Sequence, residues 1–242
     1  MGHLPLYHDK WHDLFVWLAN RSYIRMDKDE KHRKIKGLFI TRRTWTEPRS
    51  KQKSEILQVP TPQPALIGYA FIDLPNIITK GDKWGIQLDH ILNNLDWKGF
   101  SGFIRDTLGN AEHTTMSVYV NGRVIRRHGG AALYEQAIVA AREAGFTVVE
   151  MLNSAKDVDA QIIVDMMDVD FATLPKGSVV NYVLVSGDSD FLPALLRKQQ
   201  HAKRSDINFD VAVVSWSQSV SKILLRESNA RFIPLNTRID LF

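Results

Sequence analysis

The segment Asn181–Phe191 constrains the fold of this chain more than any other part of it. It contains an uninterrupted apolar run, Val183–Val185, followed closely by a glycine and by two aspartates that a single serine separates. Such a run is typical of a strand that is buried on both faces of a parallel sheet, and Gly187 permits a sharp turn after it. We therefore expect Asp188 and Asp190 at the carboxyl end of a central strand, the edge where open α/β sheets bind ligands.

Strand-like and helix-like segments alternate along the rest of the chain beyond Ala65. This alternation predicts a three-layer α/β/α domain, with a central, mainly parallel sheet and right-handed crossovers between its strands. Hydrophobic periodicity and turn residues set the expected bounds of each element. The expected strands are 65–72, 116–121, 147–151, 182–185, 211–214 and 232–235, and the expected helices are 86–95, 131–144, 157–168, 191–199 and 220–227.

The composition argues against several classes of function. The chain of 242 residues contains no cysteine, which excludes disulfides, thiolate metal sites and a cysteine nucleophile. No signal-like or membrane-spanning apolar stretch is present, so we expect a cytoplasmic protein with no membrane partner. Neither a phosphate-binding glycine loop nor a dinucleotide fingerprint occurs, and no histidine accompanies Ser186 or Ser189. NTPase, dehydrogenase and serine hydrolase chemistry therefore receive no support.

The first 60 residues differ in charge from the remainder. They carry 13 lysines and arginines against 7 acidic residues, whereas the other residues carry 18 against 20. Three prolines at positions 60, 62 and 64 mark an extended linker, so we expect a basic extension over 1–60 and a main domain over 61–242. The extension suits recruitment of a polyanion such as RNA, with a solvated basic surface as the alternative.

Two features of this extension favour particular partners. Residues 8–24 have the spacing of an amphipathic helix, which suits contact with a second copy of the chain or with another protein. Trp45 lies among Arg42, Arg43 and Arg49, and single-stranded nucleic acids stack on aromatic side chains in such basic surroundings. The helix is equally consistent with packing onto the main domain.

Acidic residues from three segments are expected to meet at one edge of the sheet. Asp73 directly follows the first strand, and Asp188 follows a later one. If these two strands are neighbours, their carboxyl ends lie about 4.8 Å apart, close enough for both side chains to share one ion. Asp159 lies in the first turn of the helix expected over 157–168 and within its apolar arc, so it should point toward the same edge. Asp165 lies roughly 9 Å further along that helix, where an exposed or internally paired carboxylate is an equal explanation. Turn formation or helix capping is the alternative for each aspartate taken singly.

Carboxylates gathered in this way predict a divalent metal site. Oxygen-rich sites select Mg²⁺ or Mn²⁺, and such ions can activate water for attack on a phosphodiester. We therefore expect Asp73, Asp159, Asp188 and Asp190 to be metal ligands and catalytic residues.

Three motifs in this constellation resemble the NYN domain family of the PIN-like nucleases. They are Phe71–Asn76, Lys156–Asp159 together with Asp165, and Ser186–Phe191, and the similarity extends over about 65–235. The resemblance implies a metal-dependent ribonuclease in which the four aspartates match the acidic positions and Asn76 lies near the scissile phosphate. The sequence departs from the family pattern at Leu74-Pro75, which we expect to stiffen the loop after Asp73.

Several polar residues are candidates for holding the substrate. The segment 121–130 is expected to be a loop at the carboxyl edge, where Arg126 and Arg127 would contact phosphates. Lys156 lies near the start of the helix with Asp159, and Ser189 lies between Asp188 and Asp190. A solvated surface position is the alternative for each basic residue.

The leading hypothesis is an endoribonuclease that hydrolyses RNA with a metal-activated water and leaves a 5′-phosphate. The alternative is a catalytically weak or inactive PIN-like protein that binds RNA or acts as a scaffold in a larger assembly. Cleavage of DNA differs from the first hypothesis only in the substrate.

Overall fold

The computed structural model describes residues 25–29, 34–39, 63–81, 88–151 and 156–242. The chain divides into two compact units, Met1–Val59 and Pro60–Phe242. In the first unit, β1 (Arg25–Asp29) and β2 (Lys34–Phe39) form an antiparallel pair. The expected helix over 8–24 and Trp45 lie outside the described residues.

The second unit contains a six-stranded sheet in which every strand pair is parallel, so the expected α/β class is confirmed. The strands lie in the order β5-β4-β3-β6-β7-β8. The direction of winding therefore reverses between β3 and β6, which makes their carboxyl ends the topological switch point of the sheet. The strands are β3 (Leu66–Asp73), β4 (His113–Asn121), β5 (Thr147–Met151), β6 (Val179–Val185), β7 (Asn208–Ser215) and β8 (Arg231–Pro234).

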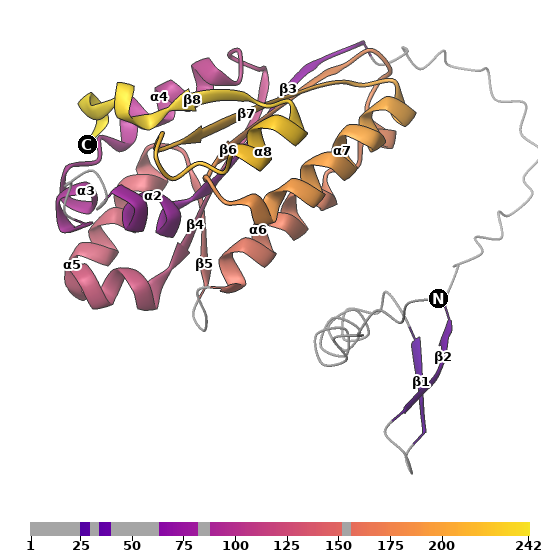
Figure 1. Ribbon diagram of the computed structural model, residues 1–242, viewed down its shortest axis with the longest axis horizontal. Coiled ribbons are helices and arrows are strands. Elements are labelled where there is room, and N and C mark those ends of the chain that lie inside the picture. Colours follow the sequence, from indigo (N-terminus) through magenta and orange to yellow (C-terminus); the bar gives the residue numbers. More distant parts are fainter. Residues whose placement is uncertain (1–24, 30–33, 40–62, 82–87, 152–155) are drawn as a thin grey trace, which may run out of the picture. The chain divides into compact units, whose positions relative to one another are not determined.

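Helices cover both faces of this sheet (Figure 1). Side chains alternate between the faces along each strand, so Ile72 belongs to one apolar cluster and Phe71 to the other. One layer contains α2 (Leu74–Gly81), α3 (Leu88–Asn94), α4 (Trp97–Thr107) and α5 (Gly122–Glu143). The other layer contains α6 (Lys156–Asp168), α7 (Leu192–Ser205) and α8 (Lys222–Ser228).

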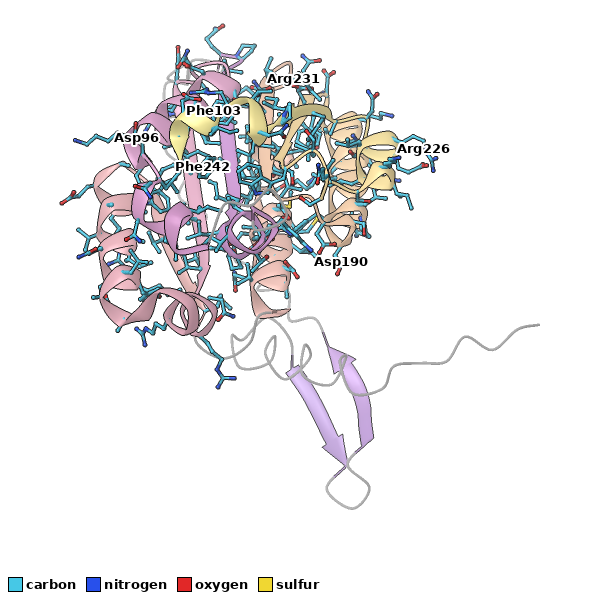
Figure 2. All side chains as sticks on the ribbon, turned by 60° about the vertical axis from the view of Figure 1, so that its left-hand side comes forward. Asp96, Phe103, Asp190, Arg226, Arg231 and Phe242 are labelled. Atoms are coloured by element: carbon cyan, nitrogen blue, oxygen red, sulfur yellow. The ribbon has the colours of Figure 1, made fainter. Side chains whose placement is uncertain are left out.

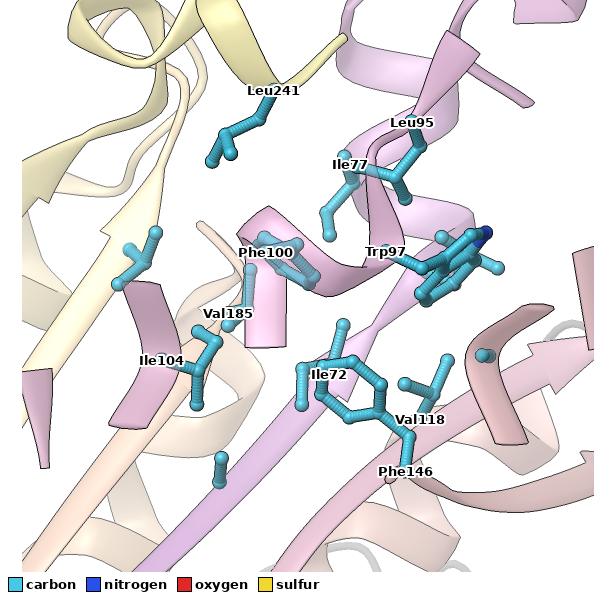
Figure 3. Close-up of a cluster of buried hydrophobic side chains, with 14 of the residues drawn as sticks. Ile72, Ile77, Leu95, Trp97, Phe100, Ile104, Val118, Phe146, Val185 and Leu241 are labelled. Atoms are coloured by element: carbon cyan, nitrogen blue, oxygen red, sulfur yellow. The ribbon is translucent and has the colours of Figure 1, made fainter. Parts of the chain in front are cut away.

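The first of these clusters is a continuous apolar core between its helices and the sheet. Figure 3 shows Phe100 and Ile104 of α4 with Val118 and Val185 of the sheet, and Phe146 beside them. The rings of Phe100 and Phe146 lie 5.9 Å apart, centroid to centroid, a separation typical of favourable aromatic pairs. This packing holds the strands in place from one face of the sheet, while polar residues lie at their carboxyl ends. No helix in the described part of the chain is long and apolar enough to traverse a lipid bilayer.

Two expectations about connecting segments are wrong. Leu74-Pro75 does not stiffen a loop but begins α2, because proline is tolerated in the first turn of a helix and the apolar residues at 74, 77 and 78 face the core. The segment expected to be a loop over 121–130 is helical from Gly122 onward and joins α5 across a kink at Gly130, whose φ is 77°. Helix α4 was not expected from the sequence. Its start is capped by Asp96 (labelled in Figure 2), which accepts hydrogen bonds from the Lys98 and Gly99 amides.

Candidate active site

The acidic motifs meet at the switch point between β3 and β6. The two strands pair in parallel, with Ile72 opposite Val185. Asp73 is therefore the last residue of its strand, and Ser186 comes directly after the neighbouring one. The strands that precede Asp73 and Asp188 are thus neighbours, which was the condition for their carboxyl ends to lie close together.

The carboxylate of Asp73 is buried and held at both oxygens. Only 3% of the residue is exposed. Its Oδ1 accepts a hydrogen bond from the backbone N–H of Asn76 at 3.1 Å, and its Oδ2 accepts one from the Ser186 hydroxyl at 3.1 Å. The first bond caps the start of α2, as the alternative reading of a lone aspartate predicted, but the second bond spans 113 residues. Asp73 therefore both caps a helix and faces the loop after β6.

A second set of bonds joins α2 to that loop. The Gly187 N–H donates to Oδ1 of Asn76 at 3.4 Å, and the Asp188 N–H donates to the Ser186 hydroxyl at 3.3 Å. Asp188 in turn accepts from the Asp190 N–H at 3.1 Å, which caps the short 3-10 helix η3 (Ser189–Phe191). Backbone and side chains together thus fix the geometry around the acidic residues.

Ser186 is a site residue that the sequence reasoning did not assign. Its hydroxyl contacts both Asp73 and the backbone of Asp188, and the residue is 1% exposed. A polar residue immediately after a buried apolar strand was the available signal. The sequence could not show its partner, because the pairing of β3 with β6 decides that contact.

Burial and neighbouring negative charges raise the pKa of two of the carboxylates, Asp73 and Asp159. Burial raises the pKa of Asp73 to about 7, and the negative charges of Asp159 and Asp188 act in the same direction. The hydrogen bonds from Asn76 and Ser186 oppose this shift but do not cancel it. Burial also raises the pKa of Asp159, as do the charges of Asp188 and Asp190. Asp159 and Asp188 are therefore within electrostatic reach of Asp73, and Asp188 and Asp190 are within reach of Asp159.

The donor set has the chemistry of a hard-cation site. None of the four aspartates forms an ion pair with another side chain that the structure describes. Unbalanced carboxylates of this kind suit Mg²⁺ or Mn²⁺, which prefer oxygen ligands. Within the described ranges, however, no group of three or more histidine, cysteine, aspartate or glutamate side chains is arranged to hold one ion. The four carboxylates are thus the type of ligand that Mg²⁺ or Mn²⁺ prefers, but no three of them are arranged around one ion position in the described residues.

Asp165 lies apart from this set. It accepts a hydrogen bond from the Tyr119 hydroxyl at 2.7 Å and another from the side-chain amide of Gln161 at 2.6 Å. These two bonds make Asp165 an internally paired carboxylate, which is one of the explanations that the sequence allowed for it. A cavity of about 540 Å³ on this face is lined by Tyr119 and Asp165 and by none of the four predicted aspartates.

The predicted substrate-binding residues fall into two groups. Asn76 contacts the loop after β6, and Ser189 is exposed in η3 beside the acids. Arg126 lies instead on α5, where it pairs with Glu135 at 3.3 Å and its guanidinium lies 4.7 Å from the ring centre of Tyr134. The side chains of Arg127 and Lys156 lie outside what the structure describes.

Comparison with known families agrees with this architecture. A parallel sheet with acidic residues at its switch point defines an α/β protein, and the model of the NYN domain, a family of the PIN-like class, matches residues 69–236. The chain belongs to the NYN domain family, so the resemblance seen in the sequence is confirmed. The match includes all four predicted aspartates and Asn76. A search of the curated proteins finds no match to this chain.

Proposed function

We propose that this protein is a metal-dependent endoribonuclease whose acidic site lies at the carboxyl ends of β3 and β6. NYN domains are generally nucleases, which supports hydrolysis of phosphodiester bonds at the level of the family. One observation carries the proposal for this chain. The charges of Asp159 and Asp188 raise the pKa of Asp73 at the switch point, those of Asp188 and Asp190 raise the pKa of Asp159, and no described cationic side chain pairs with these aspartates.

Each residue has a distinct role in this proposal. Asp73, Asp159, Asp188 and Asp190 would hold Mg²⁺ or Mn²⁺, which when bound supplies a Lewis acid that activates water and stabilises the leaving oxygen. Ser186 and the Asn76 amide hold Asp73 in place through their hydrogen bonds. Because positioned charges contribute most when they need no reorganisation, these bonds matter for the rate as well as for stability.

Substrate contacts are assigned from position and charge. The Asn76 oxygen accepts the Gly187 N–H, so its NH₂ group is directed elsewhere and would donate to a phosphate oxygen. The hydroxyl of Ser189 is exposed next to Asp188 and would serve in the same way. Arg126, Arg127 and Lys156 would contact the RNA backbone, with Arg126 leaving Glu135 to do so. Residues 1–60 would recruit the strand or mediate contact with another copy or a partner protein.

A cleavage assay tests the proposal directly. Purified protein is incubated with labelled single-stranded RNA in Mn²⁺, in Mg²⁺ and in EDTA, alongside the variants Asp188→Asn and Asp168→Asn. Asp168 is exposed at the far end of α6 and provides a matched control. We expect metal-dependent cleavage that leaves a 5′-phosphate, at least about 100-fold slower in Asp188→Asn and unchanged in Asp168→Asn. Full activity of Asp188→Asn would refute this site.

A second function is favoured by the absence of three converging metal-binding side chains in the described part of the chain. A protein with this geometry would bind RNA as a catalytically weak or inactive scaffold. Retention of intact RNA in Mn²⁺, with an affinity that Asp188→Asn leaves unchanged, would support this reading over the nuclease. Parallel assays on DNA of the same sequence separate ribonuclease from deoxyribonuclease activity.

A further inference from the structure

Trp216 contacts two parts of the acidic site, helix α2 and the turn that holds the loop after β6, and is itself in neither α2 nor that loop. It directly follows β7 and is 1% exposed. Its indole N–H donates to the carbonyl oxygen of Ile77 in α2 at 2.8 Å, across 139 residues of sequence. Ile77 is the neighbour of Asn76, so the indole holds the turn of α2 that carries the amide facing the loop after β6.

The indole is also packed closely on its other sides. A Cβ added at Gly81, the last residue of α2, would lie 3.4 Å from the Trp216 ring. The ring of Phe242 lies 5.2 Å from it, centroid to centroid. Since buried aromatic rings in such contact have little freedom to move, Trp216 restrains α2 at Ile77 and at its last residue, Gly81.

The backbone of Trp216 forms a turn that contacts the loop after β6, which carries Asp188. Its carbonyl oxygen accepts the N–H groups of Ser219 and Val220 at 3.0 and 3.1 Å. The next residue, Ser221, donates its N–H to the carbonyl oxygen of Gly187 at 2.9 Å. A Cβ at Gly187 would lie 2.9 Å from the Ser219 oxygen, so loop and turn are in direct contact.

The bond between these two parts is sensitive to small displacements. Gly187 N–H and Asn76 Oδ1 are 3.4 Å apart, at the long end of the hydrogen-bond range. A movement of α2 by a few tenths of an ångström away from the loop would therefore break it. The indole bond to Ile77 and the turn at Ser219–Ser221 together oppose that movement.

We propose that Trp216 is a positioning residue for the acidic site, acting on Asn76 through its indole N–H and on Gly187 through the turn that follows it. Its effect on the rate rests on the nuclease function proposed above. Its effect on the two backbone amides does not, because their hydrogen exchange is measured without substrate or metal.

The experiment compares Trp216→Phe with Tyr182→Phe. The Tyr182 hydroxyl donates to the Met166 carbonyl oxygen at 3.1 Å in the other apolar cluster, so both variants lose one buried donor to a helix carbonyl. In Trp216→Phe we expect exchange of the Asn76 and Gly187 amides to be about 10-fold faster than in Tyr182→Phe. The kcat should fall about 10-fold with KM within about twofold, while Tyr182→Phe keeps the kcat of the wild type.

Equal exchange of the two amides in both variants would overturn the proposal, whatever the activity. Faster exchange in Trp216→Phe from a protein that cleaves no RNA would support the positioning role and count against the nuclease. If Trp216→Phe does not fold, Phe242→Leu loosens the indole but keeps its N–H. It should then accelerate exchange of the same amides about threefold, and an unchanged rate there would equally refute the role of Trp216.

Discussion

At the scale of single residues, the carboxylate that the proposed function needs at Asp73 lowers the stability of the metal-free protein. Asp73 is buried among like charges, and an ionised carboxylate in such surroundings is costly unless a cation compensates it. Ser186 and the Asn76 amide offset part of that cost through their hydrogen bonds. Sites with this character lower the stability of the free protein in return for affinity toward a cation.

The pH dependence of stability follows from the raised pKa of Asp73. The unfolded carboxyl titrates near 3.8 and the folded one near 7, so the folded state binds more protons between these values. The free energy of unfolding of the metal-free protein should therefore fall as pH rises through this window and stay lower above it. Asp73→Asn carries no charge and should be more stable than the wild type at pH 8 by on the order of 2–4 kcal/mol.

Urea unfolding in EDTA at pH 4 and pH 8 measures this difference. The two proteins should have similar stability at the lower pH, where the Asp73 carboxyl is protonated in the folded state. A wild type that is as stable as Asp73→Asn at pH 8 would contradict the buried, uncompensated carboxylate.

The Ser186 hydroxyl provides a second prediction at this scale. Ser186→Ala removes the bond to Asp73 Oδ2 and the acceptor of the Asp188 N–H, so the pKa of Asp73 should rise further. We expect cleavage about 10-fold slower at pH 7 and a pH–rate profile displaced to higher pH. Ser186→Thr keeps the hydroxyl and is the matched control. Identical profiles for Ser186→Ala and the wild type would show that the hydroxyl does not orient the carboxylate.

At the scale of elements, the loop after β6 is held by close packing as much as by hydrogen bonds. Gly187 has no room for a side chain, since an added Cβ would lie 2.6 Å from the Ser215 hydroxyl oxygen and 3.0 Å from the Val220 Cα. The loop that carries Asp188 is therefore pressed against the end of β7 and the turn beyond it. Glycine is needed at this position for space, whereas the turn that the sequence indicated does not require it, because φ at Gly187 is not positive.

Alanine substitutions at two glycines test this packing. Gly187→Ala should lower the free energy of unfolding by about 1–3 kcal/mol and should also reduce cleavage, because the loop must move away from β7. Gly102 lies exposed in α4 with no atom near the position of an added Cβ. Gly102→Ala should therefore stabilise the protein by about 0.5–1 kcal/mol through its helix propensity. Thermal unfolding of both variants decides the matter, and a stabilised Gly187→Ala would contradict the contact.

At the scale of the whole molecule, the chain consists of one unit with an excess of basic residues and a second unit that contains the acidic site. The units Met1–Val59 and Pro60–Phe242 are compact by themselves. The second contains the entire parallel sheet and both apolar clusters. A domain of this size buries enough apolar surface to fold independently.

Residues 60–242 should therefore unfold in a single cooperative transition when produced alone. Their affinity for RNA should be lower than that of the full chain, and the dependence of log K on log salt concentration should be shallower, because basic residues in 1–59 no longer contact phosphates. Urea unfolding and titrations of labelled RNA at several salt concentrations measure both effects. An unchanged salt slope would show that the basic unit does not take part in binding.

The local sequence was sufficient to predict the strands that carry the acidic residues, but not helix α2, which carries Asn76. Apolar runs that alternate with helical segments identified each strand of the described sheet, and the predicted strand 147–151 has the bounds of β5. Helix α2 was missed because Leu74-Pro75 resembles a turn, and the core-facing positions 77 and 78 were not recognised as its apolar face. The start of α5 was missed because glycines and arginines over 122–130 dilute the helical pattern.

What the sequence by itself determined was the class of fold and the acidic residues at the strand ends, because these follow from the periodicity of neighbouring residues. Only the tertiary structure decided that β3 lies beside β6, that Ser186 holds Asp73, and that Asp165 pairs with Tyr119. These contacts join residues 46 to 113 positions apart. They depend on the order and register of the strands, which are set by the packing of the whole sheet between its helices.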